Sequence, residues 1–172
     1  GGKRWTTTDQ QLLPVLVELQ FFDAQHGVAI GRSSALFPSG VFSSDDGGRS
    51  WQPVPAKRVQ SWLTGDFTDP NSGAVAGYLG ASSVLRRRVL QPSRTVDDSL
   101  RALRKMVLTS ATSGWLIGDG GLVLSTGDLG QSWQTPLGAL PSQAEELFDF
   151  HAVAAMGQHC WVAGTPGSRV FL

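Results

Sequence analysis

One six-residue element occurs four times along the chain, and this repetition limits the possible folds more than any other feature. The element is a polar turn followed by an apolar strand that ends on glycine: HGVAIG, SGAVAG, SGWLIG and HCWVAG. Its last residues are Gly31, Gly77, Gly118 and Gly164, at steps of 46, 41 and 46 residues. A period of about 40 to 50 residues that holds several short strands is typical of a β-propeller blade.

The first copy predicts strands at 17–22, 27–31 and 40–44 and a fourth strand that begins near Trp51. The third copy repeats this order with RKMVLTS, GWLIG, GLVLST and SWQTP. The fold class is therefore all-β, with four-stranded antiparallel blades inside one partial propeller domain over 1–172. We expect the repeats at 1–12, the last strand of a preceding blade, and at 15–54, 58–98, 103–137 and 148–172.

Helix is expected only between copies. The segment 95–105 begins with a pattern that resembles a capping box, and 142–150 follows Pro141.

An eight-residue turn appears twice in the same register, as SDDGGRSW at 44–51 and TGDLGQSW at 126–133. The carboxylate can accept hydrogen bonds from backbone N–H groups of its own turn, the glycine permits a positive φ, and the tryptophan can pack between sheets. A turn that recurs within one chain is more often architecture than an active site. We assign a structural role to both copies: Ser44, Asp46, Gly48, Trp51, Thr126, Asp128, Gly130 and Trp133.

These turns resemble the Asp-box, or BNR repeat, of sialidases, xyloglucanase-type glycosidases, sortilin-type receptors and photosystem II assembly factors. The fuller pattern at 113–133, SGWLIGDGGLVLSTGDLGQSW, is similar to the photosystem II stability and assembly factor family and its relatives in non-photosynthetic bacteria. The resemblance implies a non-enzymatic propeller that binds a protein partner, as those factors bind a membrane protein complex during its assembly. It also implies a location outside the cytoplasm, in a periplasm, a lumen or the extracellular space.

The second copy departs from this pattern, because VLRRRVLQPSRTVDDS at 84–99 replaces the box. The family carries an arginine-rich surface patch used in partner binding, and this copy holds an arginine cluster. On a strand, Arg86 and Arg88 would share one face and Arg87 the other. Two interpretations follow, a solvated edge strand protected by charge or a partner-binding face: Arg86, Arg87, Arg88 and Arg94.

Residues 1–5, GGKRW, match the second half of a box without its aspartate. Two interpretations fit this pattern. The chain is a piece of a larger propeller of six to eight blades, or its head supplies the fourth strand of its last blade and closes a four-bladed ring.

A glycoside hydrolase is the alternative function, since sialidases and xyloglucanases share the box. Such an enzyme needs two carboxylates across one cleft, or a tyrosine nucleophile with a glutamate. The chain has one tyrosine, Tyr78, which we expect to pack, and its glutamates are Glu18, Glu145 and Glu146. Of these, 145–146 read as a solvated helical face. A sortilin-like peptide receptor is a weaker variant of the binding role.

The charge balance of 14 basic and 14 acidic residues gives no sign of a nucleic-acid partner. No apolar run is long enough to span a membrane. We expect no metal and no cofactor, because His26, His151 and His159 lack ligand spacing. The single cysteine, Cys160, is expected to be a buried small hydrophobe.

Overall fold

The computed structural model describes residues 4–5, 7, 12–56, 59–94, 100–138, 140–167 and 169–172. The chain is an all-β protein made of four antiparallel sheets, the architecture of part of a β-propeller, which confirms the predicted fold class. A short helix, α1 (Ser142–Leu147), and a 3-10 turn, η1 (Tyr78–Gly80), are the helical elements of the described residues. The strands are β1 (Leu16–Phe21), β2 (Gly27–Gly31), β3 (Val41–Ser44), β4 (Gln52–Pro53), β5 (Trp62–Asp69), β6 (Ser72–Gly77), β7 (Ser82–Arg86), β8 (Val89–Pro92), β9 (Leu103–Leu108), β10 (Gly114–Gly118), β11 (Val123–Thr126), β12 (Asp149–Met156), β13 (His159–Thr165) and β14 (Arg169–Phe171).

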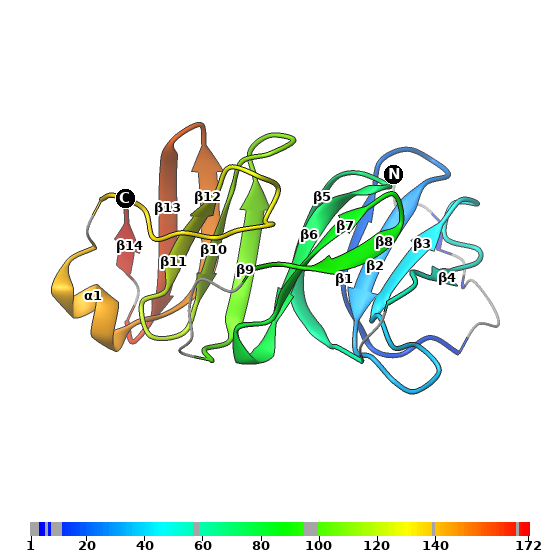
Figure 1. The fold of residues 1–172 in the computed structure, drawn as a ribbon, viewed down its shortest axis with the longest axis horizontal. Coiled ribbons are helices and arrows are strands. Elements are labelled where there is room, and N and C mark those ends of the chain that lie inside the picture. The colour runs from blue at the N-terminus through cyan, green and yellow to red at the C-terminus, as the bar shows by residue number, and fades with distance from the viewer. Residues whose placement is uncertain are drawn as a thin grey trace.

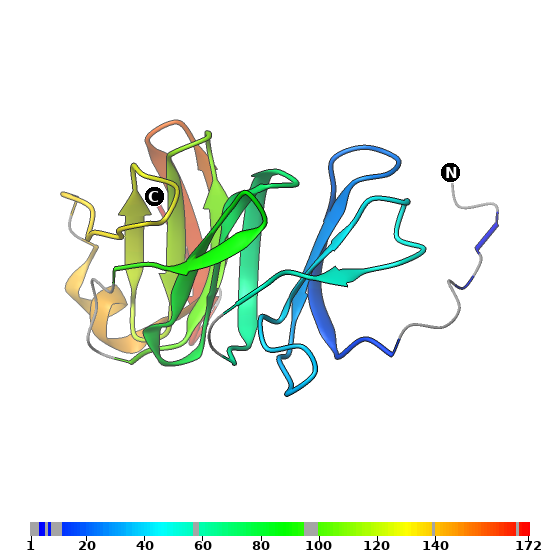
Figure 2. The same cartoon turned by 45° about the vertical axis from the view of Figure 1, so that its right-hand side comes forward.

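Each sheet is a meander in which consecutive strands pair. The orders are β1-β2-β3-β4, β5-β6-β7-β8, β9-β10-β11 and β12-β13-β14. The first strands of the sheets are neighbours, because β1 contacts β5, β5 contacts β9 and β9 contacts β12. The sheets therefore stand in a row with their first strands along a common inner side (Figures 1 and 2).

The glycine that ends each second strand has a packing reason. A Cβ atom at Gly31, Gly77, Gly118 or Gly164 would come closer than 3.0 Å to a backbone carbonyl oxygen just before or at the start of that sheet's first strand. The segment that enters each sheet crosses directly over this position, so only glycine fits without a backbone shift. In all four sheets the repeated glycine thus lies where the backbone entering the first strand passes over the end of the second strand.

The hydrophobic core lies between the sheets. Val28 and Ile30 of the first sheet pack with Val75 and Leu85 of the second, all fully buried. Alanines of β6 pack against the third sheet, and Phe150 of β12 belongs to a cluster with β10. Each sheet therefore buries its faces against its neighbours, as propeller blades do.

Polar side chains on the inner strands tie successive sheets together. Glu18 Oε2 accepts a hydrogen bond from the Gly65 N–H at 2.6 Å, and the Gln20 amide both accepts from and donates to the backbone of Phe67. One sheet further, Asp66 Oδ2 accepts from the Leu108 N–H at 2.7 Å. These bonds join groups 42 or 47 residues apart, which is about one repeat.

Two sequence predictions about helices are corrected. The segment predicted as helical at 95–105 enters β9 at Leu103, and 95–99 lie outside the described residues. The end of this segment forms a strand and not a helix because it pairs with β10 and buries Leu103 and Met106. These tertiary contacts outweigh the local capping pattern. The helix predicted at 142–150 is found at Ser142–Leu147, while Asp149 and Phe150 already belong to β12.

The predicted fourth strand of the third copy is reduced to two isolated bridges, one between Ser125 and Gln134 and one between Arg94 and Ser132. Within the described residues no strand from the head of the chain joins β12-β13-β14, and Trp5 is 89% exposed. The first and last sheets lie at opposite ends of the row (Figure 1). The described part of the chain is thus an open row of sheets rather than a closed ring.

The inner-strand hydrogen bonds predict a stability effect. Asp66→Ala removes the charged acceptor of the Leu108 N–H and should lower the free energy of unfolding by about 2 kcal/mol. Thr68→Ala, at an exposed position on the same strand, should change it by less than about 0.5 kcal/mol. Urea unfolding of both variants checks this, and equal effects would show that the Asp66 bond contributes nothing.

Candidate functional site

The first Asp-box, 44–51, closes on itself through its carboxylate. Asp46 Oδ1 accepts hydrogen bonds from the Ser44 hydroxyl and from the Ser50 N–H, each at 2.9 Å, and Oδ2 accepts from the Ser50 hydroxyl at 2.6 Å. The Ser44 hydroxyl oxygen accepts in turn from the Gly48 N–H at 2.9 Å. Gly48 adopts a φ of 81°, which glycine takes without strain. Both carboxylate oxygens are thus occupied by the turn itself.

The second Asp-box, 126–133, has the same bonds at equivalent atoms. Asp128 Oδ1 accepts from the Thr126 hydroxyl and the Ser132 N–H, each at 2.9 Å, and Oδ2 accepts from the Ser132 hydroxyl at 2.7 Å. Gly130 N–H donates to the Thr126 hydroxyl at 2.8 Å, and its φ is again 81°. Two sequences that share only the spaced residue types therefore form the same hydrogen-bond network.

These bonds favour the ionised carboxylates. Hydrogen bonds from the Ser50 hydroxyl and N–H lower the pKa of Asp46 from its usual 3.8 to about 2. For Asp128, burial works to raise the pKa, but hydrogen bonds from Ser132 and Thr126 outweigh it and the net shift is downward. A carboxyl with a lowered pKa is a poor general acid at neutral pH, so the electrostatics agree with a structural role.

The box tryptophans pack at equivalent places on their sheets. Trp133 is 2% exposed and lies between the second and third sheets, in one cluster with Ala74 and Ala76. Trp51 is 7% exposed and packs on Ala29 and Phe42 of its own sheet. Trp133 thus fills the space between two sheets, whereas Trp51 lies on the face of the first sheet opposite to the one that Val28 and Ile30 turn toward the second sheet.

In the second sheet a short turn replaces the box. Arg87 and Arg88 form a two-residue turn between β7 and β8, with φ of 50° and 59°. This conformation is typical of tight hairpin turns. The interpretation that Arg86, Arg87 and Arg88 alternate along one strand is therefore wrong, because the chain reverses direction at the second and third of them.

Two arginines of the cluster connect neighbouring sheets. The Arg88 guanidinium donates to both carboxylate oxygens of Asp45, at 2.5 and 2.8 Å, and to Asn71 Oδ1 at 3.2 Å. This fork lowers the pKa of Asp45. Arg86 donates to the Asp128 carbonyl oxygen at 3.3 Å. The second sheet is thereby joined to the Asp-box on either side of it.

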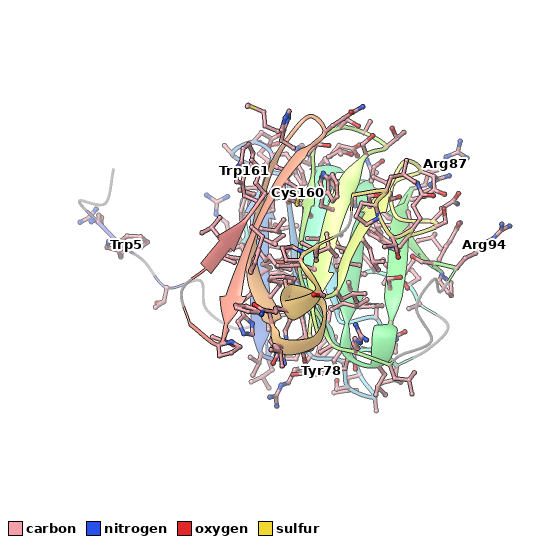
Figure 3. The ribbon with its side chains drawn as sticks, turned by 90° about the vertical axis from the view of Figure 1, so that its left-hand side faces the viewer. Trp5, Tyr78, Arg87, Arg94, Cys160 and Trp161 are labelled. Carbon is pink, nitrogen blue, oxygen red and sulfur yellow. The ribbon has the colours of Figure 1, made fainter. Side chains whose placement is uncertain are left out.

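The other two arginines of the cluster point outward. Arg87 lies in the exposed turn, and Arg94 lies just after β8, where its backbone N–H donates to the Gln131 carbonyl at 2.7 Å. In Figure 3 both side chains project away from the body on the same side. Within the described residues neither guanidinium has a hydrogen bond or an ion pair, so both charges are available to a partner.

The histidines predicted to be unsuited for metal have unrelated neighbours. His26 Nδ1 lies 2.7 Å from Asp23 Oδ2, His159 stacks on Trp161, and His151 contacts a threonine hydroxyl. Among the described residues no group of three or more His, Cys, Asp or Glu side chains could hold a metal ion.

Two single residues differ from expectation. Tyr78 was expected to pack, but it lies in η1 with its side chain 54% exposed and pointing away from the sheets (Figure 3). The strand before it ends at the glycine crossing, so Tyr78 begins an outer turn. Cys160 is half-buried rather than buried, and desolvation raises the pKa of its thiol to about 11.

Local sequence pattern alone does not predict the polar groups that gather on the inner side of the sheets. Glu18, Asp66 and Lys105 line one hollow of about 310 Å³ between the first strands, and Lys105 pairs with Glu18. Burial lowers the pKa of Lys105. Alternate polar residues on first strands, as in ELQ at 18–20 and TGD at 64–66, were the available signal. The helical residues 145–146 have side chains that lie outside the described part of the chain.

The fold and the two boxes together define an Asp-box β-propeller protein. No helix among the described residues has the length and apolar character needed to cross a membrane.

Within this class, the model of the family "Photosynthesis system II assembly factor YCF48" matches residues 94–170, which hold the third sheet and most of the fourth. The predicted resemblance to the photosystem II assembly factor family of Asp-box propellers is thereby confirmed. Over this range the chain is similar to photosystem II assembly factor propellers. No curated protein matches the chain.

Two solved structures, with TM-scores of 0.63, agree on the fold. YCF48 from Cyanidioschyzon merolae is 14% identical with a TM-score of 0.63, and the alignment covers 90% of this chain and 49% of that one. An ancestral GH74 enzyme is 16% identical with a TM-score of 0.63, covering 87% of this chain and 22% of that one. YCF48 bound to D1 peptide is 13% identical with a TM-score of 0.48, covering 99% and 69%. The chain thus spans about a fifth of the GH74 enzyme and about half of the C. merolae protein.

The lowered pKa of Asp46 predicts a pH effect. Its hydrogen bonds stabilise the fold fully above the unfolded value near 3.8 and are lost as pH falls through about 2. Asp46→Asn should be less stable than the wild-type chain at pH 7, and its stability should fall less steeply between pH 4 and 2. Thermal unfolding across this range measures both slopes. Equal slopes would mean that the turn does not hold the carboxylate in its ionised form.

The tryptophan between the second and third sheets predicts a large packing loss. Trp133→Ala should lower the free energy of unfolding by about 3 to 5 kcal/mol, because it leaves a cavity between two sheets. Leu137→Ala, at a fully exposed leucine in the next loop, is the matched control and should have little effect. Denaturant unfolding of the two variants measures both free energies of unfolding. A decrease for Trp133→Ala as small as that for Leu137→Ala would contradict this packing.

Proposed function

We propose that this chain is a protein-binding part of a non-enzymatic propeller scaffold, similar in role to photosystem II assembly factors. The observation that carries the proposal is that the carboxylates are hydrogen-bonded within the protein. In the part of the chain that the structure describes, those in the boxes and in the inner hollow already accept hydrogen bonds from the protein. The family match over 94–170 supports the same conclusion.

The inner hollow is where two carboxylates face a common space, so it is the place to look for glycosidase chemistry. Glu18 accepts from the Gly65 N–H with one oxygen and pairs with Lys105 through the other. Asp66 accepts from the N–H groups of Phe67 and Leu108, at 2.9 and 2.7 Å. A glycosidase needs one carboxyl free to donate a proton and the other free to act on the sugar or on water. Both side chains are instead occupied in joining the sheets.

The surface that favours binding is the outer edge of the second sheet. Arg87 and Arg94 present two guanidinium groups that are free of partners among the described residues, while Arg86 and Arg88 hold the turn in place. Arginines presented in this way suit carboxylate groups of a protein partner. A pre-formed edge also limits the entropy lost on binding.

A glycoside hydrolase is the alternative that the shared box leaves open. The likeness to the GH74 enzyme, at 16% identity, concerns the fold alone. No described pair of free carboxylates across a cleft favours it over the binding role.

Charge reversal on the outward arginines tests the proposal. The immobilised chain should retain a membrane-protein partner from solubilised photosynthetic membranes, and the double variant Arg87→Glu, Arg94→Glu should retain it at least about tenfold less, because like charges across an interface cost several kcal/mol. Arg32→Glu, an exposed arginine away from this edge, is the matched control and should bind as the wild-type chain does. Equal retention by all variants, or hydrolysis of xyloglucan or sialosides by the wild-type chain, would contradict the proposal.

A further inference from the structure

A largely apolar groove lies between the first and second sheets. It has a volume of about 580 Å³ and runs beside β8, the outer strand of the second sheet. Each of the two sheets that enclose it has four strands. The residues that define the groove are Trp62, Ser83, Val89, Leu90, Gln91 and Pro92.

The strand register places Leu90 at the position of a box tryptophan. In the first and third sheets the residue after the box tryptophan pairs with the third residue of the third strand, β3 or β11. In the second sheet the residue after Leu90 pairs with the third residue of β7. Leu90 therefore takes the place that Trp51 and Trp133 have in their sheets.

A leucine fills less of the space between two sheets than an indole ring does. Trp133 fills the gap between the second and third sheets, where it packs on Ala74 and Ala76. Leu90 is buried and packs with Trp62, but the groove remains beside it. Apolar interiors are stabilised by close packing, so an unfilled space of this shape favours a flat aromatic side chain. The neighbouring gap of the same molecule thus shows what this groove accepts.

Polar groups in the groove suit the backbone of an extended segment. The Gln91 side-chain amide and the Ser83 hydroxyl line it and have no hydrogen-bond partner among the described residues. An amide and a hydroxyl each both donate and accept, so they can bond to the N–H and C=O groups of a strand that lies along β8.

The charge at the end of the groove is positive. The described residues that line the groove include no charged side chain. The turn that precedes β8 carries Arg87, whose guanidinium has no partner among the described residues, and Arg88, which already pairs with Asp45. This arrangement is complementary to a segment with carboxylate groups next to its aromatic residue.

We propose that this groove binds an acidic, extended segment of a protein partner and takes up one aromatic residue of that segment beside Leu90. A carboxylate of the segment then meets Arg87. The proposal rests on the binding role assigned above to this edge of the second sheet, and it specifies the chemistry of the partner. An aromatic side chain that enters a preformed apolar space is a typical anchor of a protein interface.

Two synthetic peptides test the groove. The first carries one tryptophan between aspartates in a run of threonine and valine, and the second has alanine in place of the tryptophan. The wild-type chain should bind the tryptophan peptide about tenfold or more tighter than the alanine peptide. Calorimetric titration measures both affinities. Equal binding of the two peptides by the wild-type chain would overturn the proposal.

Filling the groove from within should abolish this preference. Leu90→Trp should bind the two peptides equally, because its own indole occupies the groove as Trp133 occupies the next gap. Leu137→Trp adds a tryptophan at an exposed position outside the groove, so it is the matched control and should keep the wild-type preference. A Leu90→Trp variant that still prefers the tryptophan peptide would contradict the proposal.

A second pair of variants tests the position of the site without changing a buried residue. Val89→Asp places a negative charge at the half-exposed rim of the groove and should weaken binding of the tryptophan peptide about tenfold, because like charges repel. Leu79→Asp, at an exposed apolar residue outside the groove, is its control and should bind as the wild-type chain does. Equal affinities of these two variants would place the site elsewhere and overturn the proposal.

The retention experiment separates this proposal from the proposed function. Wild-type retention of the membrane-protein partner by Leu90→Trp, with loss in the double arginine variant, would overturn the groove as its binding site and leave the proposed function standing. A preference for the tryptophan peptide that Leu90→Trp abolishes, without retention of any membrane protein, would support the groove and contradict the proposed function.

Discussion

The structure depends on a carboxylate that is bonded by its own turn. Asp46 and Asp128 each accept hydrogen bonds from the residue four positions later, through both its N–H and its hydroxyl. This network holds a tight hairpin at the outer side of the sheet and directs the following tryptophan onto the sheet face. At Trp133 that side chain fills the space between two sheets. A local polar interaction thereby determines how neighbouring sheets pack, and it leaves the carboxylate with no free oxygen for chemistry.

The second sheet shows what happens where this turn is absent. A two-residue turn of Arg87 and Arg88 takes its place, and Arg88 bonds to Asp45 of the preceding box while Arg86 bonds to the carbonyl of Asp128 in the next. In this sheet, contacts from arginines to neighbouring sheets thus take the place of the hydrogen bonds within an Asp-box. The inner strands add a second set of contacts, because Glu18 and Asp66 accept hydrogen bonds from the strand of the next sheet. The acidic side chains on the inner strands are in this way engaged in holding the sheets together.

The repeat made the fold predictable, because the glycine-ended strand has one packing solution and occurs four times. The bounds of β2 and β10 agree with the predicted strands at 27–31 and 114–118. The predictions that were wrong concern segments whose conformation depends on non-local contacts or on unusual backbone angles. Leu103 belongs to β9 and not to a helix because its pairing partner is in β10. The turn at Arg87 and Arg88 requires positive φ values, which the alternation of residues along a strand does not indicate. The hydrogen bond from the Gly65 N–H to the Glu18 carboxylate likewise joins residues 47 apart. Their pairing follows from the arrangement of the sheets and not from local pattern.

The central claim is that the box carboxylates are occupied by their own turns. Amide hydrogen exchange at Ser50 and Ser132 tests it most directly, because both N–H groups lie in exposed turns and have a carboxylate oxygen at 2.9 Å. The account predicts that both amides exchange as slowly as the amides paired between β2 and β3. Exchange at the rate of an open loop would show that the carboxylates are free, and it would contradict the structural role assigned to the boxes.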